Sequence, residues 1–293
     1  MRLSRGEQFA SSINYIFLGL FALLALAPFV HVLAQSLSSH HAITSGKVSL
    51  WPVDFTIQAY IRVLSERAFL NSFAVSVLRT VVGTVVNVLI TCLLAYPLSK
   101  SYIKGRSVIM FLIVFSMMFG GGMIPTFLIV KATGLLNSFW AFIIPGAVSA
   151  FNVIIMKNFF QSVPAELEES AKIDGASNMG ILFRIVVPLS MPAIATIILF
   201  HGVAHWNAFF DTVLYISNRD LFPLQVYLRE LIVFNNTDIN MNASNSLNMD
   251  STLLALESLK AAALIASTVP ILIVYPFLQK YFTKGIMLGS VKG

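Results

Sequence analysis

Long apolar stretches are the feature of this sequence that most restricts its fold. Each is long enough for a helix to cross the hydrocarbon core of a bilayer, which takes about 20 residues. Six such stretches are residues 13–35, 69–98, 108–130, 139–160, 186–216 and 260–281. Only 11% of the residues are charged, against about 25% in soluble domains. Because lipid offers backbone groups no hydrogen bonds, the sequence predicts an all-α membrane protein with six transmembrane helices.

The first apolar stretch could also be a secretory signal, because Val32-Leu33-Ala34 resembles a signal-peptidase site. This stretch is longer than the roughly 7–15 apolar residues of a signal peptide, and further apolar stretches come after it. We therefore expect an uncleaved first helix.

Lysine and arginine positions predict the orientation. Placing both termini in the cytoplasm leaves eleven of the nineteen basic residues there, mostly in short loops. This is the bias that the positive-inside rule describes. The net charge of +6 is spread between apolar stretches, so it indicates membrane topology and gives no support for nucleic-acid binding.

Glycines and prolines interrupt two of the expected spans. Gly120-Gly121-Gly122 and Pro125 predict a broken or bent third helix, and Pro145-Gly146 interrupts the fourth. Such backbone is tolerated at membrane depth only where protein or water covers it.

Residues 164–188 form the longest interior stretch that is not apolar, and they predict a helix, a sharp turn and a second helix. Pro164 suits a first helical turn, Gly175 suits the left-handed residue that ends a helix, and Ser177 can cap the second helix. The positive-inside orientation places this stretch in the cytoplasm. It is either a contact surface for a partner outside the bilayer or an ordinary polar loop.

Polar residues also occur inside the apolar stretches. One side of the second carries Ser72, Ser76, Thr80, Thr84, Asn87 and Thr91. These residues could line a pathway or pack helices together. Arg79 in the same stretch must face a partner, water or the interface.

The fifth stretch is the most polar. His201 and His205 share one face at a spacing of four residues, and Asn207 and Asp211 share another. With Trp206 nearby, this mixture suits a carbohydrate path, although an aromatic belt with helix-packing polar residues would give the same pattern.

The chain has no Gly-x-x-x-x-Gly-Lys-Ser/Thr phosphate loop, so it cannot hydrolyse ATP by that route. It has no His-Glu-x-x-His or Gly-x-Ser-x-Gly motif, and Cys92 is its single cysteine. We therefore expect no catalytic residues, no metal site and no cofactor on this chain.

A family resemblance extends this interpretation. Glu169-Ser170-Ala171, Asp174-Gly175-Ala176 and the apolar run to Pro188 resemble the EAA loop of ABC-importer permeases. Ser170 replaces an alanine of that pattern, and Val187 stands where leucine often precedes the proline. In the family this loop forms the coupling helices that dock on the cytoplasmic ATPase. The resemblance implies coupling roles for Glu169, Ser170, Ala171, Asp174, Gly175, Ala176 and Phe183.

Other segments resemble the MalG-like subunits of carbohydrate importers, in the LplC and YtcP branch that includes a permease of the bacterial alginate importer. They begin at Gly121, Trp140, His205, Arg219 and Lys284. The resemblance implies the type I ABC importer fold in the bacterial inner membrane. It divides the chain into residues 1–68, a core at 69–281 and a cytoplasmic tail at 282–293.

The implied partners are a second homologous permease, two ATPase subunits that bind ATP and magnesium, and a solute-binding protein that delivers an oligosaccharide. The implied mechanism is alternating access, and an acidic, alginate-type sugar is the best substrate hypothesis. Outer residues 217–259 would face the binding protein. Candidate residues of the sugar path are Arg79, Asn87, Asn152, His201, His205, Trp206, Asn207 and Phe210.

Two other classes remain open on the sequence. A self-contained secondary transporter or channel would need its own coupling-ion site, for which Arg79 and Asp211 are the candidate buried charges. A polytopic membrane enzyme would need clustered catalytic residues at one interface.

Overall fold

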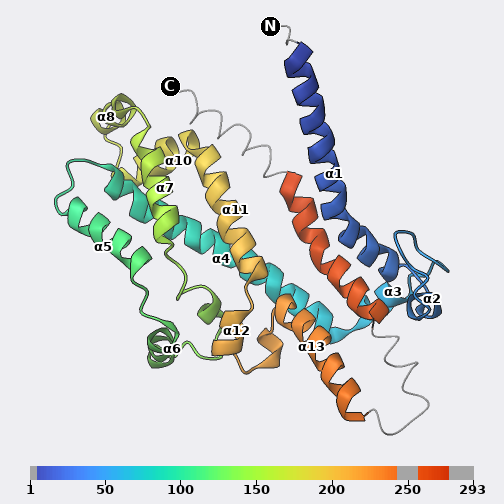
Figure 1. Cartoon of the computed structure of the whole chain (residues 1–293). Helices are drawn as coiled ribbons and strands as arrows, with labels where there is room; N and C mark the ends of the chain where they lie inside the picture. The colour runs from blue at the N-terminus through green and yellow to red at the C-terminus, as the bar shows by residue number, and fades with distance from the viewer. Residues whose placement is uncertain (1–4, 243–256, 277–293) are drawn as a thin grey trace. The chain divides into compact units, whose positions relative to one another are not determined.

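The computed structural model describes residues 5–242 and 257–276, and within these ranges it contains helices and no strand (Figure 1). The prediction of an all-α protein is therefore confirmed. The chain divides into two compact units, Met1–Leu70 with Leu228–Val269, and Asn71–Tyr227 with Pro270–Gly293.

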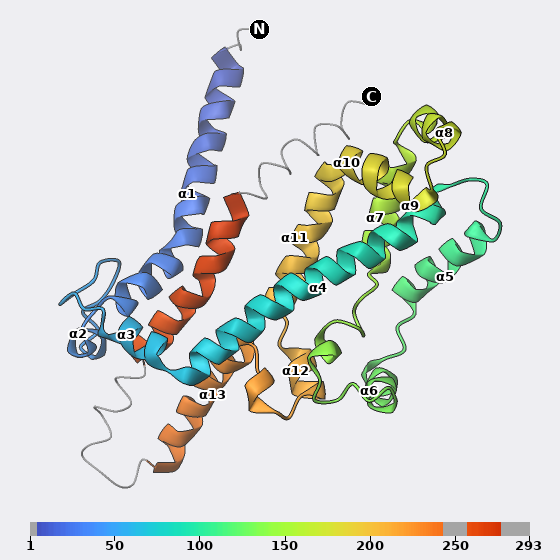
Figure 2. The ribbon, with the colours of Figure 1, turned by 180° about the vertical axis from the view of Figure 1, so that it is seen from behind.

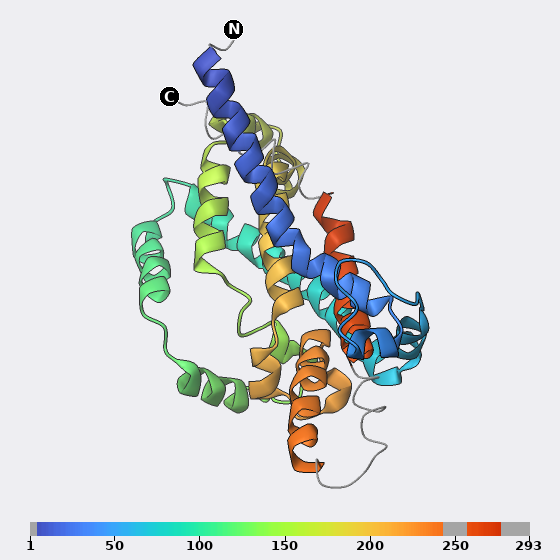
Figure 3. The same ribbon diagram turned by 45° about the vertical axis from the view of Figure 1, so that its right-hand side comes forward.

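The first unit contains the long helix α1 (Arg5–Ser36) and the short helices α2 (His40–Thr44) and α3 (Gln58–Ser65). Figure 3 shows α1 as one continuous helix. Its apolar side chains are exposed, as lipid-facing side chains would be: Leu24 is 73% exposed and Phe21 66%. Beyond α1 the chain folds back on itself, so that the Tyr60 hydroxyl of α3 lies 2.7 Å from the Ser36 hydroxyl at the end of α1.

The second unit is built along α4 (Arg67–Ser99), an unbroken helix seen over its full length in Figure 2. Its 33 residues span about 50 Å at 1.5 Å per residue. The next two helices, α5 (Arg106–Met118) and α6 (Met123–Ala132), meet at 117°. Gly122 lies at this bend with a φ of 86°, so the predicted break in the third span is confirmed.

The fourth expected span is only partly helical. A 3-10 turn, η1 (Phe139–Phe142), precedes α7 (Ala150–Gln161), and residues 143–149 between them are irregular. Pro145 and Gly146 lie in this irregular segment. At 12 residues, α7 alone is too short to cross a hydrocarbon core.

The polar stretch folds as helix, turn and helix. Helix α8 (Ala165–Ile173) is followed by α9 (Asn178–Ile181), one π-helical turn η2 (Leu182–Val186) and α10 (Val187–Leu189). Gly175 has a φ of 81° and the Ser177 hydroxyl accepts a hydrogen bond from the Gly180 amide, as predicted. Pro164 is the N-cap and lies one residue before the helix.

The prediction of one continuous fifth span at 186–216 is wrong. The chain bends by 88° between residue 189 and α11 (Met191–Asn207), where Pro188 and Pro192 remove two backbone donors. It breaks again at Ala208, whose extended ψ of 133° separates α11 from α12 (Phe210–Tyr215). A 3-10 turn η3 (Arg219–Leu221) and α13 (Leu224–Asn242) complete this part of the chain.

Two apolar clusters form the core of the second unit. One joins the end of α4 with α7, η2 and α11, and includes Val153, Phe160, Val186 and Ile197, all fully buried. The other joins α4, α6, η1 and α12 around Phe142, Ile143 and Tyr215. These clusters hold in place the helices that carry the buried polar side chains.

Three described helices are long and apolar enough to cross a membrane: Ser11–Ser36 within α1, α4, and Glu257–Pro276. The two bent pairs, α5 with α6 and Asn178–Leu189 with α11, could each form one further span. The end of the sixth expected span, the Asn-rich run at 243–248 and the tail at 282–293 lie outside the described residues.

Candidate functional site

A polar centre inside the second unit brings together residues of α4, α7 and α11. Asn87 of α4 places its Nδ2 3.0 Å from His205 Nε2 and 3.4 Å from His201 Nδ1. Asn152 of α7 places its Nδ2 3.0 Å from His201 Nε2. All four side chains are at least nine-tenths buried. The expectation that His201 and His205 share a face of one helix is thus confirmed, and that face points at α4.

The hydrogen-bond roles in this centre can be assigned by chemistry. A neutral imidazole has one donor and one acceptor nitrogen. The oxygen and nitrogen of an asparagine amide have nearly the same shape, so their positions are assigned from the hydrogen bonds they make. If Asn87 donates to both rings, His201 must donate from Nε2 to the Asn152 oxygen. Every ring nitrogen in these contacts is then satisfied, while the buried Asn87 Oδ1 has no partner among the described residues.

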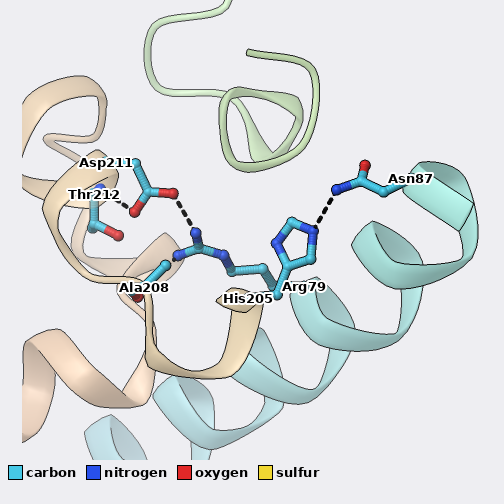
Figure 4. Close-up of polar contacts among 6 residues, drawn as sticks. All are labelled: Arg79, Asn87, His205, Ala208, Asp211 and Thr212. Atoms are coloured by element: carbon cyan, nitrogen blue, oxygen red, sulfur yellow. Dashed lines mark hydrogen bonds and ion pairs between the residues drawn. The ribbon is translucent and has the colours of Figure 1, made fainter. Parts of the chain in front are cut away.

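A second element of the site is an ion pair between Arg79 of α4 and Asp211 of α12 (Figure 4). Arg79 is 1% exposed, and its Nη1 also donates to the Ala208 carbonyl at 3.2 Å. Its guanidinium carbon lies 4.6 Å from the centre of the Phe142 ring. The other oxygen of Asp211 accepts from the Thr212 amide at 2.8 Å. The pair therefore joins α4 to the break between α11 and α12.

These residues line a cavity of about 510 Å³, which is within the usual range of small-molecule sites. Phe151 and Phe200 line the same cavity, with ring centroids 6.3 Å apart. The structure therefore brings together Arg79, Asn87, Asn152, His201 and His205 of the expected sugar path.

The other three residues expected in the path lie elsewhere. Trp206 packs edge-on against Phe73 and lines a separate, apolar pocket. Asn207 is exposed and donates to the Val203 carbonyl at 2.9 Å, and Phe210 is 53% exposed. The prediction that Asn207 and Asp211 share a helix face is wrong, because α11 ends at Asn207.

Five of the six members of the polar stripe on α4 are buried and Thr80 is half-buried; the buried members are Ser72, Ser76, Thr84, Asn87 and Thr91. Its members do different things. Ser76 accepts a hydrogen bond from the Leu224 amide at 2.7 Å, which is a packing role. Asn87 lines the cavity. Ser76 thus has the packing role, and the role of Asn87 in a pathway stays a prediction.

Sequence reasoning missed Gly83, which lets α4 and α11 approach closely. A β-carbon at this position would lie 2.5 Å from His205 Nε2. One feature of the sequence could have identified it: Gly83 is a single glycine one turn from Asn87, on the polar side of a long helix. Glycine is used where another group must come close to the backbone.

The surface of α8 and α9 is the second candidate site. Expected contact residues Glu169, Ser170, Asp174, Gly175 and Ala176 are all exposed. Large apolar side chains accompany them, with Ile173 87% exposed, Met179 58% and Phe183 44%. Ala171 is half-buried and packs partly against the core.

Sequence reasoning also missed how α8 is attached. Glu168 is 4% exposed and forms an ion pair with Lys100, just after the end of α4. The Tyr96 hydroxyl donates to the same carboxylate at 3.4 Å, and the Lys100 ammonium lies 4.8 Å from the Tyr96 ring centre. The carboxylate of α8 is thus anchored to the cytoplasmic end that the sequence predicts for α4.

Comparisons of the sequence with known proteins all identify the same family. The model of the family described as "Binding-protein-dependent transport system inner membrane component" matches residues 1–288. The Bacillus subtilis polygalacturonan/rhamnogalacturonan transport system permease protein YtcP is 47% identical over 95% of this chain and 96% of its own. The LplC protein of the same organism is 45% identical over 96% of this chain and 94% of its own.

A solved structure gives the same result at the level of the fold. It is a chain of a bacterial ABC transporter involved in the import of the acidic polysaccharide alginate. That chain is 38% identical, with a TM-score of 0.86 over 96% of this chain and 99% of its own. The likeness therefore extends over nearly the whole chain.

Proposed function

The chain belongs to the family of inner membrane components of binding-protein-dependent transport systems, and we propose that it imports acidic oligosaccharides as one of two unlike permease subunits of an ATP-driven transporter. Two ATPase subunits bind below it, and a solute-binding protein delivers the sugar from outside. In this proposal the segment from η1 to α7 is the sixth membrane crossing beside the three long helices and the two bent pairs, and both termini and the loop at 164–188 lie in the cytoplasm.

The observation that carries this proposal is the surface of α8 and α9. Ile173, Met179 and Phe183 are exposed large apolar residues beside the polar residues Glu169 and Asp174. A loop that must stay in water gains nothing from such side chains, whereas a protein interface combines an apolar centre with a polar rim. An ATPase subunit is the partner that a chain without a phosphate loop needs for driven transport.

The ion pair of Glu168 with Lys100 supports a route from this surface to the cavity. Closure of the ATPase dimer moves α8, and the anchored carboxylate transmits that movement to α4. Helix α4 also carries Arg79 and Asn87, which line the cavity. Alternating access results if this movement opens the cavity to opposite sides of the membrane in turn.

Acidic oligosaccharides are the substrate class that the relatives favour. Both the polygalacturonan/rhamnogalacturonan permease and the alginate importer are described by polysaccharides that carry carboxylates. The cavity offers amide and imidazole groups for hydroxyls, and the Phe151 and Phe200 rings for the apolar faces of sugars. An aromatic and polar lining of this kind suits a carbohydrate.

Substitution of Gly175 tests the coupling role. Valine at a φ of 81° costs roughly 1–2 kcal/mol of strain and distorts the turn between α8 and α9. Proline cannot adopt this φ at all. We expect Gly175→Val to leave the protein inserted while uptake falls relative to ATP hydrolysis, because the strained turn no longer holds α8 and α9 in the coupled geometry. A loss of about 1.4 kcal/mol from that geometry corresponds to a fall of about tenfold. Uptake and hydrolysis are measured on the same vesicles.

Gly134→Val is the matched control, because Gly134 also has a positive φ, of 71°, in the turn after α6. It introduces similar strain outside the predicted cytoplasmic loop and is expected to keep uptake and hydrolysis in proportion. Normal coupling in Gly175→Val would overturn the coupling role. Uptake by the chain without any ATPase would instead favour a secondary transporter.

A further inference from the structure

We propose that the Asp211 carboxylate binds the Arg79 guanidinium in the place that a carboxylate of the sugar takes during transport. An acidic oligosaccharide that enters the cavity displaces Asp211 from Arg79. This inference rests on the proposed function and adds the group that recognises the negative charge of the substrate, the Arg79 guanidinium. Arg79 becomes the residue that determines specificity for acidic sugars, and Asp211 becomes its competitor.

The charges around the cavity lead to this assignment. Among the described residues that line it, Arg79 and Asp211 are the charged side chains. The remaining lining groups are neutral polar or apolar side chains. An acidic sugar in this cavity therefore meets one cation, and that cation is already paired with a carboxylate (Figure 4).

Arg79 is held in place by contacts that do not depend on Asp211. Its Nη1 donates to the Ala208 carbonyl, and its guanidinium lies over the Phe142 ring. Its Nε is buried and has no hydrogen-bond partner among the described residues. The guanidinium can therefore keep its position while one carboxylate replaces another, with a donor still free.

Asp211 is the partner that can leave. Its side chain is 24% exposed, against 2% for the side chain of Arg79. It stands in the first turn of α12, beside the break at Ala208, and it keeps its bond to the Thr212 amide if it releases Arg79. A displaced Asp211 can be hydrated, whereas an unpaired Arg79 cannot.

This asymmetry gives selectivity by charge. A neutral sugar that separated the pair would leave a buried guanidinium without a counter-charge, which is strongly unfavourable. A carboxylate from the substrate replaces the lost interaction with one of the same kind. The planar guanidinium is well suited to this exchange, because it binds carboxylates in a fixed fork.

The polar centre around Asn87 completes the contact with an oligosaccharide. Asn87 lies eight residues from Arg79 on α4, a rise of about 12 Å, so one sugar ring cannot reach both. The buried Asn87 Oδ1 lacks a donor among the described residues and can accept from a hydroxyl of a neighbouring ring. The site thus fits a segment of two or more sugars with a carboxylate at the Arg79 end.

The test measures binding to the purified transporter complex in detergent, without the solute-binding protein. The probes are trigalacturonate and the same trisaccharide with its carboxylates reduced to hydroxymethyl groups. In Asp211→Asn the guanidinium is released from its internal competitor. We expect affinity for trigalacturonate to rise about tenfold, since the form with a free guanidinium is a minor population in the original protein. Affinity for the reduced probe should not change.

Two further variants make the result interpretable. Arg79→Gln combined with Asp211→Asn removes both charges together, so no buried charge is left alone, and it should bind the two probes equally. Asp220→Asn removes an exposed carboxylate outside the cavity and should behave like the original protein.

An unchanged ratio of the two affinities in Asp211→Asn and in the double variant would overturn the inference and leave the pair a purely structural contact. Failure of the original complex to bind trigalacturonate while it binds the reduced probe would overturn the acidic substrate class itself, and the inference with it. The two failures are therefore distinguishable.

Discussion

At the scale of single residues, two neighbouring glutamates have opposite environments. Glu168 is buried against Lys100 and Tyr96, whereas Glu169 is exposed. A helix turns by about 100° per residue, so adjacent side chains face different directions. Glu168 attaches α8 to its own chain, and we propose that Glu169 contacts the ATPase.

Glu168→Gln tests that division. It leaves the Lys100 ammonium without its counter-charge, and breaking a buried pair in this way costs about 3–5 kcal/mol. We expect faster amide hydrogen exchange along α8 in the isolated chain. Glu169→Gln should leave the exchange unchanged and weaken ATPase binding. Equal exchange rates in both variants would contradict the assignment.

The sequence could predict which residues need a partner but not which partner they find. Arg79 and Asp211 were both recognised as charges that must be compensated, yet they are separated by 132 positions and only the packing of α12 brings them together. Asp211 and Phe210 follow the break at Ala208, where no glycine or proline signals the end of α11. Trp206 and Asn207 belong to α11 itself and lie outside the cavity because of the way this helix is turned against α4.

At the scale of helices, the crossing of α4 and α11 determines the geometry of the polar centre. Gly83 leaves room for the His205 ring, and Gly202 of α11 lies opposite Thr84, whose Oγ1 would be 3.6 Å from an added β-carbon. The first approach is too close for any side chain, and the second is an ordinary contact. The two glycines therefore differ in how well they tolerate alanine.

Gly83→Ala is expected to push His205 away from Asn87 and to destabilise the protein by about 1–3 kcal/mol, as overpacked cores do. Thermal unfolding in detergent measures this, and the same variant should lose affinity for the trisaccharide probe. Gly202→Ala is the matched control and should unfold at nearly the original temperature. A stable Gly83→Ala protein with unchanged binding would show that the close approach is not required.

Helix breaks were predictable to different degrees. The glycines at 120–122 marked the bend between α5 and α6, because a positive φ there suits glycine. The prolines at 188 and 192 fit the first turns of a span, so their positions do not by themselves predict the bend of 88° between residue 189 and α11. The apolar stretches of the sequence predict where the helices lie. The angle at which two successive helices meet depends instead on the side chains that pack on either side of the bend.

At the scale of the whole molecule, exposed apolar surface indicates where lipid or another protein covers the chain. None of the apolar window of α1 is buried within its own chain, and lipid or the second permease can cover it. The exposed apolar residues of α8 and α9 lie in the stretch that the basic residues place in the cytoplasm. Lipid cannot cover residues in the cytoplasm, so under the proposed orientation a protein partner is what covers them.

The most direct test of this account is site-specific cross-linking in membranes from Ile173→Cys, at the most exposed large apolar residue of the described part of the chain. The account predicts a cross-linked product with the ATPase subunit. Cysteine at Ile61, 57% exposed on α3 and expected outside, should give none. A cysteine at 173 that forms no such product and reacts only with reagents added from outside would contradict the central claim.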